Sequence, residues 1–254
     1  MTKRWFPQKE KILLKMRICA LVLSVLFLTG ALLACSDTPG TGTPKSSGVA
    51  SEKAVVPAVK DARKDAQEQV RLGRKLARGS KDEQKKAAAL FRIAADAGDA
   101  EGMGRLARAY RLGQGVQKDH AEAKKLYEQA IAAGYAAGKV GLGHMYRLGT
   151  GAEKDETKAC DLYYSAAEQR IAGGMYYYGR CLEDGLGNRE KSPQDAEQWY
   201  RKALEVDKDY CYVYIGLARL YTRGTGVEKN LEEAAKIYKS AEERGCTAPE
   251  RLQE

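Results

Sequence analysis

Two glycine pairs flanked by basic side chains are the first candidates for a ligand-binding site in this sequence. They occur in "YRLGQGVQKD", starting at Tyr110, and in "YRLGTGAEKD", starting at Tyr146. Glycines one residue apart let a backbone approach a phosphate, as in nucleotide-binding loops. No predicted strand precedes either loop and no Gly-Lys-Ser/Thr follows, so the context of a nucleotide site is missing. The interval of 36 residues between the copies indicates instead a structural part that is used repeatedly.

Side chains that could act as catalysts or metal ligands are scarce. The two histidines, His120 and His144, are too few and too far apart for a His-rich metal site, and there is no Cys-x-x-Cys. No serine has a lysine three residues later, so the signature of the serine β-lactamases is missing. The acidic residues follow helix-surface and capping patterns. We therefore expect no catalytic residue, no metal and no cofactor.

The formal net charge of +9 comes mostly from the start of the chain. Residues 1–34 contain six Lys or Arg and one acidic residue, whereas residues 35–254 have a net charge of only +4. A basic start followed by an apolar run is what an export signal requires. The charge distribution thus argues against a nucleic-acid partner.

The apolar run is Ile18–Leu33, whose 16 residues suit the core of a signal peptide and are short for a membrane span. Ala34 and Cys35 follow, in an order that resembles the bacterial lipoprotein box. The resemblance implies that residues 1–34 are removed and that Cys35 becomes a lipid-modified N-terminus carrying palmitate. Met16 is an alternative start, and an uncleaved anchor with a chance cysteine is the alternative interpretation.

The residues after Cys35 indicate the membrane in which the lipid anchor is inserted and the distance between anchor and domain. Ser36 stands where the inner-membrane retention signal of lipoproteins would place Asp, which implies a lipid anchor in the bacterial outer membrane, on its periplasmic face. Residues 35–58 are rich in Gly, Pro, Ser and Thr and predict a flexible tether with a mean span of about 25 Å. The folded domain is predicted over residues 59–246, with 247–254 as a tail.

One helical pattern recurs five times after the tether. It consists of Ala, two residues, Leu, Ile or Trp, an aromatic residue, two residues and Ala, a spacing that places all four on one helical face. The aromatic residues are 36, 36, 37 and 38 positions apart and are Phe91, Tyr127, Tyr163, Tyr200 and Tyr238. Favoured N-cap residues precede the last four helices, namely Asp119, Asp155, Ser192 and Asn230. Asp119 and Asn230 also have a glutamate three residues later, as in a capping box.

A second helix type alternates with the first. Its copies are "LARAYRLG", "LGHMYRLG", "YGRCLEDG" and "LARLYTRG", and "LGRKLARG" at residues 72–79 is a weaker first copy. The second residue of each full copy is Ala or Gly, which permits close approach of helices. The final Gly fits the left-handed position at a helix C-terminus. The glycine pairs then turn the chain into the next helix.

This alternation resembles the Sel1-like repeat, a subfamily of the tetratricopeptide repeats, over about 185 residues. Residues 106–133 and 142–169 follow the family pattern Leu-Gly-x-x-Tyr-x-x-Gly-x-Gly closely, whereas the first unit, at about 59–97, lacks the Gly-x-Gly loop. The resemblance implies an all-α solenoid of about five helix pairs. It also implies a right-handed superhelix whose first helices line the concave face.

Four cysteines remain after Cys19 leaves with the signal and Cys35 is acylated. An even number in an oxidising compartment suggests two disulfides. Antiparallel neighbouring helices bring the start of one next to the end of the other. This arrangement predicts the pairs Cys160–Cys181 and Cys211–Cys246, with buried free thiols as the alternative.

Aligning the repeats places a column of mostly basic residues on the first helices: Arg74, Arg108, His144, Arg180 and Arg219, with Arg111 and Arg147 three residues further on. In tetratricopeptide relatives the first position commonly faces ligand. The resemblance therefore implies a ladder of cations for an acidic peptide, a C-terminal carboxylate or an acidic polysaccharide. Flat contact surface could come from Tyr176, Tyr177, Tyr212 and Tyr214. The alternative is that these arginines are ordinary solvated helix residues.

The sequence is thus that expected of a non-enzymatic periplasmic adaptor lipoprotein that binds other envelope proteins or an anionic polymer in its groove. The resemblance implies a role in envelope assembly or secretion. Two other functions remain open from the sequence. One is a β-lactamase-like or penicillin-binding enzyme, against which the missing Ser-x-x-Lys argues. The other is a surface-displayed effector that binds host proteins.

Overall fold

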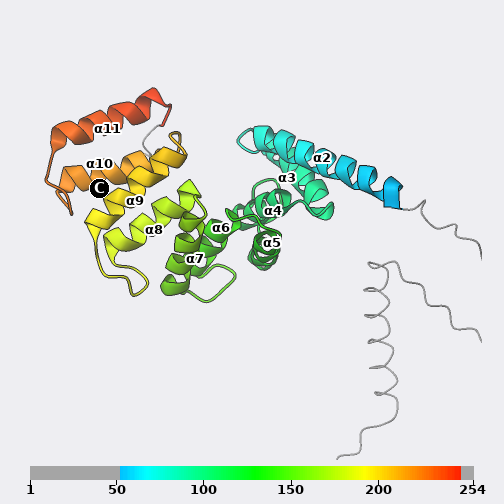
Figure 1. Ribbon diagram of the computed structural model, residues 1–254, viewed down its shortest axis with the longest axis horizontal. Helices are drawn as coiled ribbons and strands as arrows, with labels where there is room; N and C mark the ends of the chain where they lie inside the picture. The colour runs from blue at the N-terminus through cyan, green and yellow to red at the C-terminus, as the bar shows by residue number, and fades with distance from the viewer. Residues whose placement is uncertain (1–51, 247–254) are drawn as a thin grey trace, which may run out of the picture. The chain divides into compact units, whose positions relative to one another are not determined.

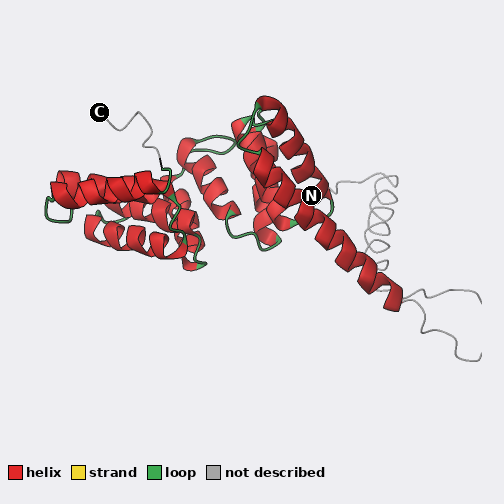
Figure 2. Ribbon diagram, turned by 90° about the horizontal axis from the view of Figure 1, so that it is seen from above, coloured by secondary structure: helices red, strands yellow, loops and turns green. Residues whose placement is uncertain are grey.

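The computed structural model describes residues 52–246, and side chains from residue 63 onward. The predicted signal segment 1–34, Cys35, most of the tether and the tail 247–254 lie outside the described residues. Within the described part the chain forms ten α-helices and no strand (Figure 1, Figure 2), so the predicted all-α solenoid is confirmed. The helices are α2 (Glu52–Leu76), α3 (Lys81–Asp96), α4 (Ala100–Leu112), α5 (His120–Ala132), α6 (Gly138–Leu148), α7 (Glu156–Glu168), α8 (Ala172–Asp184), α9 (Pro193–Val206), α10 (Cys211–Arg223) and α11 (Leu231–Glu243).

The helices pack as consecutive pairs, which we number units one to five. In each unit the first helix packs on the second: α2 on α3, α4 on α5, α6 on α7, α8 on α9 and α10 on α11. Each second helix also contacts the first helix of the next unit. The first helices of neighbouring units also contact each other. For example, α4 contacts α6, and α6 contacts α8. The chain therefore stacks its units in sequence order, as the colours of Figure 1 show.

Helix α2 begins at Glu52, inside the segment predicted as a tether. Residues 52–76 include four alanines and four lysines, which favour helix, and this preference extends the first helix beyond the repeat. Between residues 52 and 246 no helix is both long enough and apolar enough to span a bilayer.

Side-chain caps begin the second helix of every unit. In each, the cap accepts a hydrogen bond from the backbone N–H three residues later, and the caps are Ser80, Asp119, Asp155, Ser192 and Asn230. The last four were predicted and are confirmed. A full capping box forms in α3, where Glu83 also accepts from the Ser80 backbone N–H at 2.7 Å. The box predicted for α5 is half formed, because Glu122 lies 3.3 Å from Lys125 instead.

The Gly-x-Gly loops are structural. The first glycine ends the first helix in the left-handed conformation, as Gly113 does with φ 71°. The second glycine also has positive φ, and it lies against the start of the second helix in the preceding unit. A Cβ at Gly115 would lie 2.1 Å from the Gln84 carbonyl oxygen, and one at Gly151 would lie 2.7 Å from the His120 carbonyl oxygen. Each loop thereby seats one unit on the unit before it.

Aromatic rings of the second helices form the core. Phe91, Tyr127, Tyr163 and Tyr200 are buried. The small residue of the facing first helix makes room for the ring, since a Cβ at Gly143 would lie 2.5 Å from Tyr163 Cε1. The equivalent Tyr238 of unit five is 37% exposed, because no further unit packs over it in the described part of the chain.

The four remaining cysteines form two disulfides in the structure, in the predicted pairs. Cys160 and Cys181 join α7 to α8 with an S–S distance of 2.05 Å, so this bond links unit three to unit four. Cys211 and Cys246 close unit five with an S–S distance of 2.04 Å.

Gly115→Ala should destabilise the protein more than Gly134→Ala. Both glycines have positive φ, which costs about 1–2 kcal/mol for Ala. Only Gly115 also has a backbone oxygen in the space a Cβ would fill, whereas nothing lies within 4 Å of that space at Gly134. Urea unfolding of both variants measures the difference. Equal losses of unfolding free energy would show that the loop contact contributes nothing.

Candidate functional site

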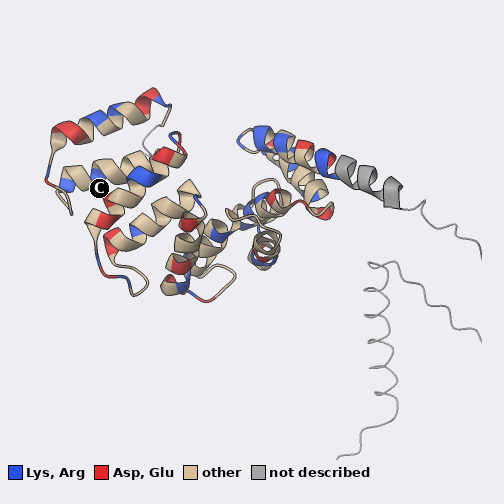
Figure 3. Ribbon diagram, in the orientation of Figure 1, with Lys and Arg blue, Asp and Glu red and all other residues tan. Residues whose placement is uncertain are grey.

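A groove of about 500 Å³ runs across the first helices and the loops between units. No acidic side chain in the described part of the chain lines the groove. The polar side chains of its wall are arginines, tyrosines and one histidine. These residues are Arg78, Arg105, Arg108, Arg111, Tyr127, Tyr135, His144, Tyr177, Tyr210 and Tyr212. Elsewhere on the units basic and acidic residues are interspersed (Figure 3), so the groove is a local concentration of positive charge.

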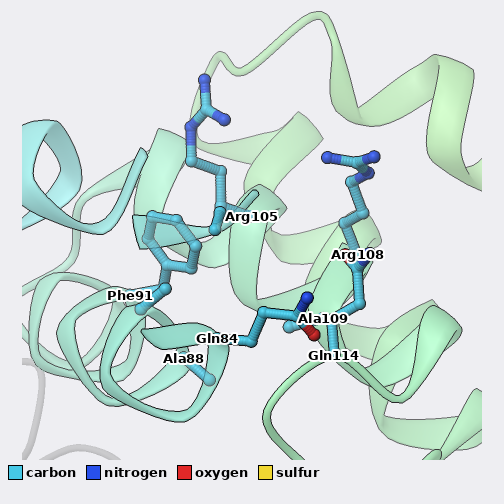
Figure 4. A pocket seen from close by; sticks show the side chains of 9 residues that line it. Gln84, Ala88, Phe91, Arg105, Arg108, Ala109 and Gln114 are labelled. Carbon is cyan, nitrogen blue, oxygen red and sulfur yellow. The ribbon is translucent and has the colours of Figure 1, made fainter. Parts of the chain in front are cut away.

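Helix α4 supplies most of that charge. Arg105, Arg108 and Arg111 follow each other at intervals of three, which keeps them near one face of the helix. In Figure 4 Arg105 and Arg108 leave α4 on the same side, next to a smaller pocket of about 20 Å³ beside Phe91. Arg105 is paired with Glu101 at 2.5 Å. Arg108 and Arg111 make no ion pair with any described residue.

His144 is neutral, so it adds no charge to the predicted column. Its Nδ1 lies 2.9 Å from the Tyr163 hydroxyl, and its ring meets the Tyr177 ring edge-on at 4.3 Å between centroids. Burial lowers the pKa of His144 to about 3, helped by the positive charge of nearby arginines. These are Arg111, Arg147 and Arg108. The arginines therefore converge on the histidine from two neighbouring units.

Arg111 and Arg147 each carry one buried donor that no described residue accepts. This donor is the Nε atom in each side chain. Burying a charged donor without an acceptor costs free energy. Tyr127 lies beside Arg111, and Tyr163 lies beside Arg147. Each tyrosine provides a hydroxyl group but no negative charge to compensate the arginine. An anion is the complementary group for this position.

The predicted ladder of cations does not continue into units four and five. Arg219, only 16% exposed, donates from Nε and Nη2 to the buried Glu183 at 2.9 and 2.6 Å. Tyr200 donates to the same carboxylate at 2.6 Å. Arg180 is held by Asp184 at 3.0 Å. At the other end Arg74 is exposed and lies 3.8 Å from Glu101. Internal acids thus neutralise the predicted cations outside units two and three.

The tyrosines predicted to face the groove divide in two. Tyr177 and the 51% exposed Tyr212 line it. Tyr176 and Tyr214 are buried, and Tyr214 donates to the Lys208 carbonyl. Adjacent residues on a helix point about 100° apart, and the rotation of each helix decides which of them faces the groove.

Sequence reasoning missed Arg78, Arg105, Tyr135 and Tyr210. Arg105 was detectable, because it lies one helical turn before Arg108. Tyr135 and Tyr210 lie in the connections between units, where no helical period marks them. Of potential metal sites, no group of three or more His, Cys, Asp or Glu side chains comes together in the described residues.

Stacked helix pairs with recurring ring contacts and glycine loops define an α-solenoid of helix-hairpin repeats. The chain belongs to the Sel1 repeat family, whose repeat matches residues 69–99, 100–135, 136–170, 172–206 and 212–246. A solved Sel1 repeat protein from Oxalobacter formigenes is 29% identical, with a TM-score of 0.58, over 71% of this chain and 70% of that one.

A second solved relative is the c5321 protein of uropathogenic Escherichia coli, described as a protective antigen with this repeat fold. It is 28% identical with a TM-score of 0.56, and the match covers 75% of this chain. This chain spans 41% of that longer protein. No curated protein matches the sequence significantly.

Acid should weaken the fold through His144. In the native state this side chain stays neutral, whereas in the unfolded chain it takes up a proton below its ordinary pKa of 6.5. The unfolded state then binds more protons, so the free energy of unfolding falls as pH drops from 6.5 towards 3. Between pH 8 and pH 5 the loss from this residue is about 2 kcal/mol. His144→Gln, compared by urea unfolding at both pH values, should lose less stability than the parent. An identical pH dependence would contradict the assignment.

Arg219→Ala should be strongly destabilising at neutral pH, by about 3–5 kcal/mol, because it leaves the buried Glu183 carboxylate unpaired. Arg71→Ala is the matched control, since Arg71 also pairs with a glutamate but is 57% exposed, and should cost about 0–1 kcal/mol. Thermal or urea unfolding of the two variants tests the contrast. Similar losses would show that the Glu183 ion pair is not a structural support.

Proposed function

We propose that this protein is a non-enzymatic adaptor, anchored by a lipid on Cys35 to the periplasmic face of the outer membrane. In this proposal its groove binds an envelope protein or an anionic polymer and so supports envelope assembly or secretion. Sel1 repeat proteins usually mediate protein–protein interaction. The groove supports the binding role, and residues 1–36 of the sequence support the lipid anchor.

The proposal rests mainly on the groove, which no acidic side chain of the described residues lines. Arg108 and Arg111 face it without an ion pair, and Arg147 lies close by, within reach of His144. A concave, positively charged wall focuses the electrostatic field on an anionic partner. Exposed Tyr212 and half-buried Tyr177 add flat surfaces of the kind enriched at protein interfaces.

The anchor rests on the sequence. The basic start, the apolar run Ile18–Leu33 and the Ala34–Cys35 junction favour a lipoprotein, and Ser36 favours the outer membrane. A tether of Gly, Pro, Ser and Thr before the first helix would hold the groove away from the lipid surface. Such an arrangement suits a protein that captures partners beside a membrane.

One observation favours a second candidate, a protein displayed on the cell surface that binds host proteins. The related c5321 protein is described as a protective antigen. Protease treatment of intact cells separates the two locations, because only a surface-displayed chain is cleaved before the outer membrane is opened.

Photocrosslinking from the groove tests the binding proposal. A photoreactive phenylalanine at Tyr212, which lines the groove, should capture a defined partner in the protein's own envelope. The same group at Tyr164 is the control, because Tyr164 is 38% exposed on the second helix α7 and does not line the groove. Equal capture from both positions, or capture from Tyr164 alone, would contradict binding in the groove.

A further inference from the structure

We infer that an extended peptide binds across units two and three through two of the peptide's carboxylates, one held at Arg111 in the groove wall and the other at Arg147, which lies near the groove residue His144. This inference rests on the proposed function and specifies the chemistry of the partner. It comes from comparing three residues that occupy the same place in successive units. They are Arg111, Arg147 and Glu183, each 36 positions after the one before.

Unit four shows how this place holds a carboxylate. There it is filled by Glu183, which is 6% exposed. Its two oxygens accept three hydrogen bonds: two from Arg219 of the next unit, at 2.9 and 2.6 Å, and one from the Tyr200 hydroxyl at 2.6 Å. Tyr200 is the core ring of the second helix. The fold thus builds a carboxylate site from a core tyrosine and an arginine.

Units two and three keep the tyrosine and lack the carboxylate. Tyr127 and Tyr163 occupy the place of Tyr200 and are buried like it. Arginine replaces Glu183 in both units, and the Nε atoms of Arg111 and Arg147 are buried with no acceptor among the described residues. Guanidinium groups bind carboxylates through two parallel hydrogen bonds. In these two units the place of the carboxylate is therefore taken by a cation whose Nε is unpaired among the described residues, and a carboxylate from outside would complement it.

The separation of the two arginines limits the partner further. Arg111 is on α4 and Arg147 is on α6, which are neighbouring helices. Packed helices have axes about 8–10 Å apart. A peptide in the polyproline II conformation has three residues per turn and rises about 3.1 Å per residue, so side chains at positions i and i+3 share one face about 9 Å apart. Two acidic residues with this spacing match the two arginines.

The rest of the groove favours a peptide of this conformation. Tyr177, Tyr210 and Tyr212 lie beyond the arginines, and Tyr210 and Tyr212 have ring centroids 5.8 Å apart. Grooves lined by aromatic rings bind polyproline II segments, whose backbone is already extended. The partner is therefore a proline-containing acidic segment of another protein.

Fluorescence anisotropy with the purified full chain tests this inference. The probe is a fluorescein-labelled nine-residue peptide, proline at every position except for glutamates at its third and sixth. Glutamine at both positions should weaken binding at least about tenfold, because hydrogen bonds from a guanidinium to a neutral amide are weaker than those to a carboxylate. Placing the two glutamates next to each other should also weaken it. Equal affinity for the glutamine peptide would overturn the inference.

Variants of the arginines locate the site. Arg111→Gln and Arg147→Gln should each weaken binding about tenfold. Arg223→Gln is the matched control, because Arg223 also lies in the last turn of a first helix but is exposed and belongs to unit five, away from the arginines around His144. If the control weakens binding as much as the other two, the effect is one of general charge and the inference fails.

Arg147→Glu separates binding from folding. The new carboxylate would stand where Glu183 stands, with Tyr163 in the place of Tyr200 and Arg180 in the place of Arg219. We expect the melting temperature of this variant to be preserved while peptide binding is lost. Retained peptide binding would overturn the inference, as would a binding loss that only follows unfolding.

Polygalacturonate, an acidic polysaccharide, serves as the competing probe. If it binds and the peptide does not, the inference is wrong and the proposed function stands. If neither binds and photocrosslinking from Tyr212 captures nothing, both the inference and the proposed function fail.

Discussion

The contact between a small residue of each first helix and an aromatic ring of the second helix is the constraint on which the structure depends. At Gly143 the backbone comes so near the Tyr163 ring that a Cβ would be only 2.5 Å from it. Burial of one ring per unit supplies apolar contact that a single helix pair cannot otherwise provide. Since each second helix also meets the next first helix, the ring is covered from two units. Tyr238, at the last unit described, has only one of these neighbours and is exposed.

Repetition of this contact gives equivalent positions equivalent surroundings. In units two to four one position lies next to the ring hydroxyl at the edge of the core, and it holds Arg111, Arg147 and Glu183 in turn. In unit four the acid is satisfied by Arg219 and the hydroxyl, and the result is a buried support. In units two and three the position is cationic and its buried Nε has no acceptor in the part of the chain that the structure describes. The same backbone thus provides a structural ion pair in unit four and a partly unpaired cation in units two and three.

The stabilising cross-links and the groove cations lie in different parts of the chain. The Cys160–Cys181 bond joins units three and four, and Cys211–Cys246 closes unit five. The ion pair around Glu183 lies in the same half. The groove cations of α4 lie in the other half, where they crowd around a neutral His144. A histidine held without charge limits the repulsion among these arginines, which a protonated ring would increase.

The amino-acid sequence was enough to predict the repeat, the alternation of helix types, the caps such as Asp119 and Asp155, and the role of the glycine loops. These follow from local signals, namely a 3.6-residue period, a side chain that reaches its own backbone and a residue that tolerates positive φ. The cysteine pairs also followed, since antiparallel neighbours fix which ends meet. Which charges remain unpaired could not be predicted in this way, because it depends on tertiary contacts. Whether Arg219 faces a partner or Glu183 depends on contacts 36 residues apart, and whether Tyr176 or Tyr177 faces the groove depends on the rotation of a packed helix. Neither is a property of local sequence, because both are set by which side chains the stacking of units brings together.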